Sequence, residues 1–449
     1  MLPLPGFPAW GAPPDATKDH VDTTYTYNLG PTGERGWIYN PGNDWAFVPE
    51  GLTYESRQIK VTTVDAGSPA AGVLQANDVI LGLGSTLFTN DARRAFGRAI
   101  TEAEKTANGG QLRLKVWRNG GTNDNVTITL PVMGSYSDTA PYDCPKSALI
   151  LSNACNYMAP ERSTVAIPKA MPSSVWPCWP PGGRRTWRRC GPTPDQLPLG
   201  VGTLTVPLNQ MCAWPWGYNN TFLSEYYLAT GDTNVLHAIS EYTITSAKGQ
   251  SWCGLCGHGM AWPKPDGSST HGIVPPYGAL NQAGILVAIG IVLGDKCGIT
   301  NAEIAPAIER PRKYFGSFAG KGAVPYGQDP AEELHDDNGK NGEAALLLAL
   351  QTQADMSPQV QYFAKSRTAA YAVRNFGHCG PFWAQLWQPL AANLGGTNAM
   401  AAHFQEIAWE LDLSRRPNGS FVHHASVGYT ADTTDAWGTD SDTAKVMLT

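Results

Sequence analysis

Helical segments recur in pairs along residues 201–449, and this rhythm constrains the fold more than any other feature of the chain. In each pair, a more apolar helix, a tight turn and an amphipathic helix follow one another, with about 50 to 60 residues between pairs. Repeats of this length predict a solenoid or a closed ring, because each unit buries its apolar face only against its neighbours. Buried helices that alternate with amphipathic ones favour the ring. We therefore expect residues 136–449 to form an all-α, (α/α)6-type toroid that stops inside its last helix.

Start and stop signals place the individual helices. Gly231 follows one helix and Thr233 starts the next, which is the usual order of a C′ glycine and a new N-cap. Thr300 and Glu303 form a capping box, and Ser357 precedes Pro358 at the first helical position. The expected helices span residues 146–158, 221–230, 233–248, 277–293, from 300 onward, 341–353, from 358 onward, 382–394 and 397–413.

Residues 50–135 have a different pattern and indicate a small strand-rich domain. Strands are expected at 58–64, 111–117 and 126–130, and a helix from 91 to about 107. Between them, Gly67-Ser-Pro-Ala-Ala-Gly72 is followed, after five residues, by Asp78-Val-Ile80. This run resembles a bacterial-type PDZ domain, and PDZ domains capture a peptide by adding it as a strand to a sheet edge. The resemblance implies an extended peptide or a peptide C-terminus as partner. Alternatively, the protein's own chain fills the groove and the domain is only a docking module.

Two stretches lack a regular period. Residues 1–49 are rich in Pro, Gly, Asp and Thr, and we expect an irregular leader. Residues 160–205 combine many prolines with Trp and Arg. This atypical segment is open to three interpretations: a basic aromatic binding loop, an irregular insertion, or a stretch that is not native coding sequence because of a shifted reading frame. We favour the third and place no site there.

Composition excludes some functions. The formal net charge of -6 leaves no basic stripe, so no nucleic-acid partner is expected. No apolar run reaches the length of a transmembrane helix. Charged residues are only 16% of the chain, while Gly (48) and Trp (15) are abundant, which fits an extracytoplasmic protein, periplasmic or secreted. A signal peptide is not evident, and nine cysteines, an odd number, leave at least one unpaired within the chain.

The chain as a whole resembles an uncharacterised bacterial family that joins a PDZ domain to a helical toroid. The resemblance covers nearly the whole sequence except about 160–205, and it implies the architecture but no proven chemistry. Hydrolases, lyases and cyclases share such toroids, which is analogy at the level of the fold. Besides the PDZ run, the resemblance is carried by residues 28–33, 35–38, 134–146, 222–232, 277–284, 335–341 and 377–380.

Polar and aromatic residues precede each expected inner helix, and in a toroid all inner helices start at the same end. These residues should therefore surround one mouth, beside several positive helix ends that suit an anionic or polyhydroxylated ligand. Capping and loop hydrogen bonds use the same residue types, so a structural role is the alternative for each. The candidate catalytic residues are His335, Asp336, Asp337, His378, Tyr218 and Glu225. The candidate substrate-binding residues are Trp214, Trp216, Asn219, Tyr277, Asn281, Asn338, Lys340, Asn341, Trp383 and Trp437.

The roles follow from chemistry. His335 or His378 could act as general base, oriented by Asp336 or Asp337, and Tyr218 could donate a proton to a leaving group.

The spacing of Cys253, Cys256 and His258 is typical of metal ligands, but no fourth ligand is specified nearby, so we predict no metal and no cofactor.

These features predict an extracytoplasmic hydrolase or polysaccharide lyase that acts on a polysaccharide-like or peptide polymer, or on a small polar substrate. The PDZ-like domain would serve as its docking module. A non-catalytic glycan- or peptide-binding scaffold protein with the same mouth is the alternative, so the sequence leaves open whether the protein is an enzyme.

Overall fold

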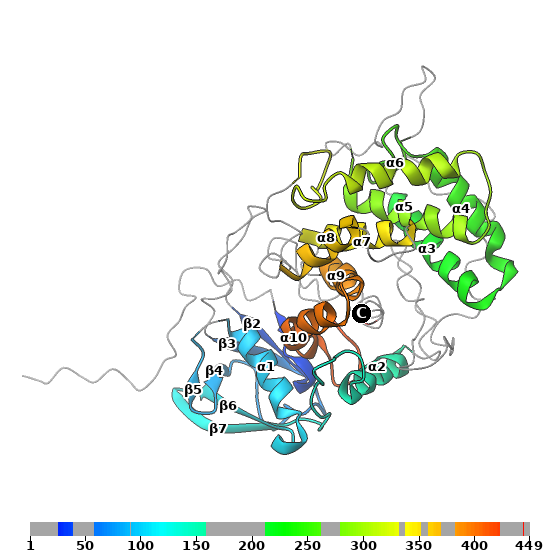
Figure 1. The fold of residues 1–449 in the computed structure, drawn as a ribbon. Helices are drawn as coiled ribbons and strands as arrows, with labels where there is room; N and C mark the ends of the chain where they lie inside the picture. Colours follow the sequence, from blue (N-terminus) through cyan, green and yellow to red (C-terminus); the bar gives the residue numbers. More distant parts are fainter. Residues whose placement is uncertain are drawn as a thin grey trace, which may run out of the picture. The chain divides into compact units, whose positions relative to one another are not determined.

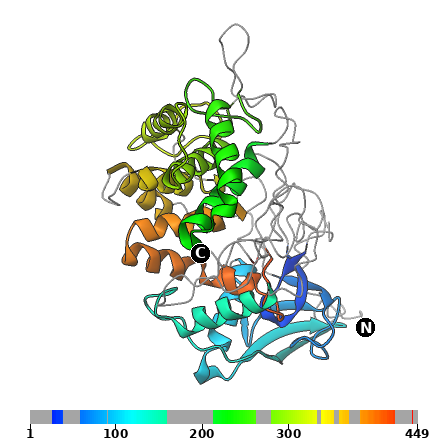
Figure 2. The ribbon, with the colours of Figure 1, turned by 90° about the vertical axis from the view of Figure 1, so that its right-hand side faces the viewer.

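The computed structural model describes residues 26–38, 58–89, 91–158, 212–261, 279–331, 337–351, 358–369, 382–422 and 443 (Figures 1 and 2). The chain divides into two compact units. Unit 1 comprises residues 1–153 and 404–439, and unit 2 comprises residues 154–403 and 440–449. Helix α10 (Thr397–Ser414) begins in unit 2 and ends in unit 1. Among the described helices, none is both long enough and apolar enough to span a membrane.

Unit 1 contains a seven-stranded antiparallel sheet in its described part, with the order β1-β2-β3-β4-β6-β7 and β5 paired to β4. Helix α1 (Ala92–Ala103) lies between β5 and β6 in the sequence, and α2 (Pro145–Tyr157) follows the sheet and runs into unit 2. The strands, blue to cyan in Figure 1, are β1 (Tyr27–Asn28), β2 (Glu34–Ile38), β3 (Ile59–Val64), β4 (Val79–Leu83), β5 (Thr86–Leu87), β6 (Gln111–Arg118) and β7 (Gly121–Thr129).

The sheet forms where the sequence alternates. Along β6, the side chains of Leu112, Leu114 and Val116 are buried and those between them are more exposed, so one face of the strand meets the core. Phe96 and Ile100 of α1 belong to the same apolar cluster. Hydrophobic burial on one sheet face and one helix stripe thus builds the core of unit 1.

Residues 26–38, the described part of the expected irregular leader, contain regular strands. Strand β2, which lies before residue 50, pairs antiparallel with β3 along its whole length, and β1 pairs with β2. A short 3₁₀ turn (Gly30–Thr32) connects these two strands, and the positive φ of Gly33 (77°) closes it. Within these described residues, Gly30, Pro31 and Gly33 belong to a tight turn between two strands.

Unit 2 is helical. Helices α3, α5, α7 and α9 pack each against the next, while α4, α6 and α8 pack against members of this first set (Figure 1). Their bounds are α3 (Ala213–Thr230), α4 (Leu236–Lys248), α5 (Asn281–Lys296), α6 (Ile304–Gly316), α7 (Lys340–Gln351), α8 (Pro358–Ala369) and α9 (Phe382–Leu394), with 3₁₀ turns at Thr233–Val235 and Asp337–Gly339.

Burial separates the two sets of helices. Every residue of α5 from Asn281 to Gly294 is buried, whereas α6 buries only one stripe. Two glycines allow α3 and α5 to approach closely. A Cβ on Gly217 would lie 2.6 Å from Leu286 Cγ, and one on Gly290 would lie 3.1 Å from Asn220 Cβ. The alternation of buried and amphipathic helices that the sequence indicates is therefore present in the structure.

Several helix boundaries differ from those expected. Helix α3 starts at Ala213 rather than at residue 221, because the aromatic run before residue 221 is itself helical. Helix α6 starts at Ile304, and the side chain of Asn301 accepts the backbone N–H of Glu303 there, so the expected capping box does not open the helix. The boundaries of α9 agree with the expectation.

Candidate functional site

An aromatic stack joins the first turns of α3 and α9. The ring of Trp383 stacks on Trp214 with the centroids 5.2 Å apart, and on Tyr218 with the centroids 6.0 Å apart. Trp383 and Tyr218 are buried, whereas Trp214 is partly exposed. The first and the last helices of the set α3, α5, α7 and α9 therefore meet through three residues that the sequence placed at a common mouth.

Histidine 258 extends this stack. The indole Nε1 of Trp214 donates a hydrogen bond of 2.8 Å to Nδ1 of His258, and the two rings lie 6.0 Å apart. Because Nδ1 accepts this bond, His258 carries its ring proton on Nε2 when neutral. Sequence reasoning considered His258 only as part of a metal motif and missed it as the partner of Trp214.

The start of α5 is tied to two neighbouring segments by side-chain amides. Nδ2 of Asn281, a fully buried residue, donates to the carbonyls of Pro325 (2.9 Å) and Gly327 (2.7 Å). Next to it, Nε2 of Gln282 donates to the carbonyl of Asn338 at 2.9 Å. The predicted site residues Asn281 and Asn338 are thus linked through α5.

The start of α7 is shaped by left-handed backbone. Asn338 has a φ of 62° and Gly339 a φ of 72°. A Cβ on Gly339 would lie 3.0 Å from the carbonyl oxygen of Trp383, so the tight turn needs glycine where it touches α9. Lys340 and Asn341 follow directly and are buried. The turn therefore brings the starts of α7 and α9 into contact.

Asn341 has a structural role in this arrangement. Its Oδ1 accepts the backbone N–H of Val324 at 2.9 Å, and its Nδ2 donates to Oγ of Ser366 at 3.2 Å. Asn281 and Asn341 therefore both hold the connector around residues 324–327. These amides stabilise the positions of helix starts, and their bonds are directed at protein rather than at an open surface.

The remaining described candidates lie elsewhere. Trp216 is buried in the core beside Tyr242, with the ring centroids 6.2 Å apart, and Nδ2 of Asn219 donates to the hydroxyl of Tyr242 at 3.1 Å. Glu225 is partly exposed, further along α3. Helical periodicity thus turns Trp216 and Asn219 away from the face that carries Trp214 and Tyr218, whereas Glu225, seven residues after Tyr218, lies on that face about two turns further along α3.

The other candidates fall outside the described residues. These are His335, Asp336, Tyr277, His378 and Trp437, together with the side chain of Asp337. The proposed base and its orienting carboxylate therefore stay predictions, and so does their position relative to Trp214.

The cysteine motif of the sequence forms part of a tight turn. Oγ of Ser251 lies 3.3 Å from Sγ of Cys253 and accepts the backbone N–H of Leu255 at 3.1 Å. Cys256 is buried, and burial raises the pKa of its thiol. Within the part of the chain that the structure describes, no group of three or more His, Cys, Asp or Glu side chains is placed to hold a metal ion.

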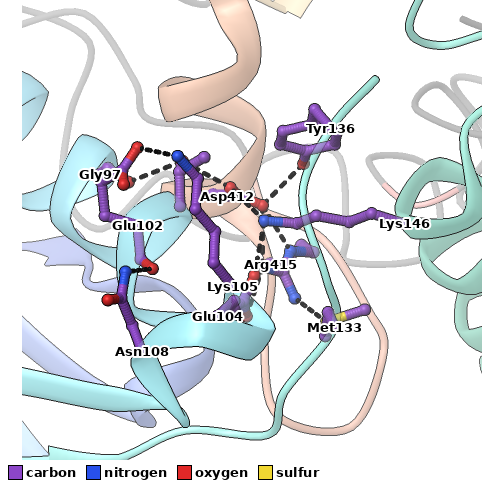
Figure 3. Close-up of polar contacts among 11 residues, drawn as sticks. Gly97, Glu102, Glu104, Lys105, Asn108, Met133, Tyr136, Lys146, Asp412 and Arg415 are labelled. Atoms are coloured by element: carbon purple, nitrogen blue, oxygen red, sulfur yellow. Dashed lines mark hydrogen bonds and ion pairs between the residues drawn. The ribbon is translucent and has the colours of Figure 1, made fainter.

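A buried cluster of charges in unit 1 was not foreseen (Figure 3). The Nζ of Lys146 lies 2.8 Å from Oε2 of Glu104 and 3.1 Å from Oδ2 of Asp412. Arg415 Nη2 contacts the same two carboxylates, at 2.7 Å and 2.8 Å. All four side chains are almost entirely inaccessible to solvent. Two cations and two carboxylates thus form a neutral group of charges in the interior.

Hydrogen bonds complete this cluster. The hydroxyl of Tyr136 donates to Oδ1 of Asp412 at 2.8 Å, and Thr101 Oγ1 donates to Oδ2 of Asp412 at 2.7 Å. Burial by itself would raise the pKa of Asp412, but the charges of Arg415 and Lys146 outweigh it and hold the pKa below its ordinary value. The carboxylate is therefore ionised. The sequence signal was the run 134–146, which contains Tyr136 and Lys146 but had no assigned role.

A family model described as "Domain of unknown function (DUF6288)" matches residues 202–449, more than half of the chain. The chain belongs to the DUF6288 family. The match covers α3 to α10, and so it includes the aromatic stack and the amides of α5 and α7 but not the sheet of unit 1. No curated protein and no solved structure matches this DUF6288 protein significantly.

Proposed function

We propose that unit 2 is an (α/α) toroid that binds a polysaccharide-like or peptide polymer at the end where α3, α5, α7 and α9 begin, and cleaves it as a hydrolase or a lyase. The stack of Trp214, Trp383 and Tyr218 carries the proposal, because it brings the first and last of these helices together at their starts. The proposed setting is extracytoplasmic, in keeping with the low charge and the many Gly and Trp residues.

The chemistry of the stack favours a ligand with flat apolar faces and a polar rim. Trp214 is partly exposed, and its indole N–H is fixed by His258, so the orientation of the ring is set before a ligand arrives. A preorganised aromatic surface binds with a smaller loss of conformational entropy. Pyranose rings and extended peptides both offer such faces, and the positive helix ends favour anionic members of either class.

For unit 1 we propose a PDZ-like fold. Its support is the antiparallel sheet with α1 inserted between β5 and β6, and the local role of Asp78. This carboxylate accepts the backbone N–H of Gln75 at 2.9 Å and Nε of Arg118 at 2.7 Å, and so closes the turn before β4. Asp78 belongs to the run from Gly67 to Ile80 on which the resemblance depends.

A panel of acidic and neutral polysaccharides, with casein as a peptide polymer, tests the function of unit 2. New reducing ends, unsaturated products or peptides are measured with the full chain. We expect His335→Ala or His378→Ala to lower the rate roughly 100-fold or more, as for loss of a general base. Trp214→Ala should weaken binding by about 3- to 10-fold, the size of an aromatic contact. Trp252→Ala is the matched control, because Trp252 is 70% exposed and is not part of the stack.

A non-catalytic binding protein is the second candidate, and one observation favours it. The described amides at the helix starts, Asn281 and Asn341, are bonded to protein segments, which is a structural role rather than a catalytic one. Binding that Trp214→Ala weakens, without turnover in the wild type, would support this alternative. Binding equally unaffected by Trp214→Ala and Trp252→Ala would contradict both candidates.

A further inference from the structure

The end of α10 lies alongside α1 within unit 1. Three side-chain contacts join them: Arg94 Nη2 to Glu406 Oε2 at 2.7 Å, Thr101 Oγ1 to Asp412 Oδ2 at 2.7 Å, and Arg415 Nη2 to Glu104 Oε2 at 2.7 Å. The partners are 312, 311 and 311 positions apart in the sequence. A nearly constant separation means that the two helical segments run in the same direction, side by side, over about three turns.

The two segments touch at backbone distance. A Cβ on Gly97 would lie 2.4 Å from the carbonyl oxygen of Trp409, so α1 needs glycine at this point. The side chains of Trp409 and Leu413 are buried in the same apolar cluster as Phe96 and Ile100. The end of α10 therefore supplies part of the core of unit 1.

The same segment contacts β1 at the edge of the sheet. Nδ2 of Asn28 donates to the carbonyls of Leu413 (2.7 Å) and Arg415 (2.8 Å). In the turn that leads from β1 to β2, a Cβ on Gly30 would lie 2.9 Å from the carbonyl oxygen of Asp412, and one on Gly33 would lie 3.3 Å from Pro417. The protein's own backbone thus lies against both the edge strand β1 and the turn that follows it.

An external peptide would need a free sheet edge, since strand addition is how PDZ domains bind. In the part of unit 1 that the structure describes, the main path of the sheet has its edges at β1 and β7, and β5, only two residues long, pairs with β4 beside this path. The β7 edge carries the exposed polar residues 122–125, a composition that discourages pairing with another strand. The β1 edge is more buried, and residues 412–417 contact β1 and the turn that follows it.

We propose that residues 406–417 are the built-in occupant of the recognition face of unit 1, so that this unit holds its own chain and takes no external peptide. The proposal rests on the PDZ-like fold of unit 1 and is independent of the polymer proposed for unit 2. It resolves the two alternatives that the sequence left open, in favour of the docking module.

The buried charges make this occupancy permanent rather than a lid that opens. Asp412 and Arg415 come from the occupying segment, and Glu104 and Lys146 come from the rest of unit 1. Withdrawal of the segment would break the contacts of Lys146 with Asp412 and of Arg415 with Glu104, and would leave Glu104 and Lys146 with only each other as charged partners. The lost contacts between these buried charges oppose the withdrawal.

Peptide binding in trans tests the proposal. The probe is a fluorescein-labelled synthetic peptide of residues 404–421, titrated into the full chain and followed by anisotropy. We expect no binding to the wild type and saturable binding to the variant Trp409→Ala/Leu413→Ala, whose own segment has lost its apolar anchors. Adding Arg94→Glu to that variant should weaken the binding about 5-fold, and a peptide with Glu406→Arg should restore it. Binding to the wild type, or none to a folded double variant, would overturn the proposal.

Hydrogen exchange on the full chain provides a measurement that does not depend on the folding of the double variant. In Arg94→Glu, amides of α1 and of residues 404–415 should exchange faster by the same factor, because the two segments open only together. The exchange in Arg94→Glu/Glu406→Arg should return to the wild-type rate. Faster exchange of residues 404–415 while α1 stays protected would show a segment that leaves by itself, and would refute permanent occupancy.

Discussion

Each unit holds together segments that are distant in the sequence, and the two units use different kinds of interaction to do so. Unit 1 uses ionised groups, with Glu104, Asp412, Lys146 and Arg415 in contact inside it. Unit 2 uses neutral groups, and the amides of Asn281 and Asn341 hold its connectors through backbone atoms and a hydroxyl. A substitution that removes a neutral amide leaves its hydrogen-bond partners unpaired. A substitution that removes a buried ion leaves an unpaired charge in the interior. The units should therefore differ in how much a single substitution costs and in how they respond to pH.

The largest effect is expected from Lys146→Met, which keeps the length of the side chain and removes the charge. Glu104 and Asp412 then have only Arg415 as a cationic partner, and we expect unit 1 to lose roughly 3–5 kcal/mol of stability. Hydrogen exchange of β6 amides in increasing urea measures this loss for unit 1 alone. Lys105→Met is the matched control, because its partner Glu102 is exposed and such pairs contribute about 0–1 kcal/mol. Similar losses in both variants would contradict the difference between the units.

The second-largest effect is a dependence of the stability of unit 1 on pH. Burial raises the pKa of Glu34 in β2 from 4.5 to about 8; the side chain of Thr32 lowers this pKa and the charge of Asp78 raises it, but burial has the largest effect. Below pH 4.5, Glu34 is protonated in both the folded and the unfolded chain. Above it, the unfolded chain releases the proton and the folded chain keeps it, so stability falls as pH rises, until about pH 8.

Between pH 6 and pH 8, this linkage should lower the stability of unit 1 by roughly 2–3 kcal/mol. Urea unfolding at several pH values, read from β6 amides, measures the slope. Glu34→Gln has no group to ionise and should flatten the slope. An unchanged slope in Glu34→Gln would show that another group causes the dependence.

A smaller effect is expected in unit 2. Asn281→Ala removes the donors of two bonds and leaves the carbonyls of Pro325 and Gly327 without these partners, for a loss of roughly 1–3 kcal/mol. The loss should not vary between pH 6 and pH 8, since no charge is involved. Exchange of α5 amides measures it. Asn219→Ala serves as control, because its single bond to Tyr242 is only partly buried and its loss should cost less. A pH-dependent loss in Asn281→Ala would contradict the neutral character of this site.

The sequence predicted the periodic parts of the molecule better than its irregular parts. Helix α9 was bounded correctly, since its apolar run ends at Gly395 and Gly396, and the sequence marks both ends of such a helix. The strands β1 and β2 were missed, because they are two and five residues long and surround a Gly- and Pro-rich turn. In so short a segment, pairing with β3 decides the structure, and the propensity of the residues themselves does not.

The aromatic stack was predictable to the extent that helix order decides it. The sequence placed Trp214, Tyr218 and Trp383 near each other on the expectation that the inner helices start at the same end, and the structure brings these three residues together. The charge cluster was not predictable, since Lys146 and Asp412 are 266 positions apart. No periodicity connects two residues at that separation, and a lysine beside a helix start is ordinarily exposed.

The smallest effect is expected from ion pairs on the surface of unit 2, which contain the same charged groups as the buried cluster of unit 1 but are exposed to water. On α6, Arg312 and Lys313 lie 2.6 Å and 3.3 Å from Oε1 of Glu309, and all three side chains are at least 40% exposed. The hydrogen bond from Arg312, followed by that from Lys313, lowers the pKa of Glu309 to about 2, so its contribution is present above pH 4.5 and is lost as the pH falls toward 2. Because water screens the pair, Arg312→Ala should cost no more than about 0.5 kcal/mol.

Salt separates this pair from the buried cluster. At about 1 M NaCl the screening length falls to roughly 3 Å, so the small effect of Arg312→Ala should disappear, while the loss in Lys146→Met should persist. Exchange of α6 amides and of β6 amides in the same samples gives both quantities. If the loss in Lys146→Met fell as strongly with salt as that in Arg312→Ala, water and ions would have access to the cluster. The proposed permanent occupancy of unit 1 by residues 406–417 would then lose its physical basis, because water could solvate the charges of an accessible cluster when the segment leaves.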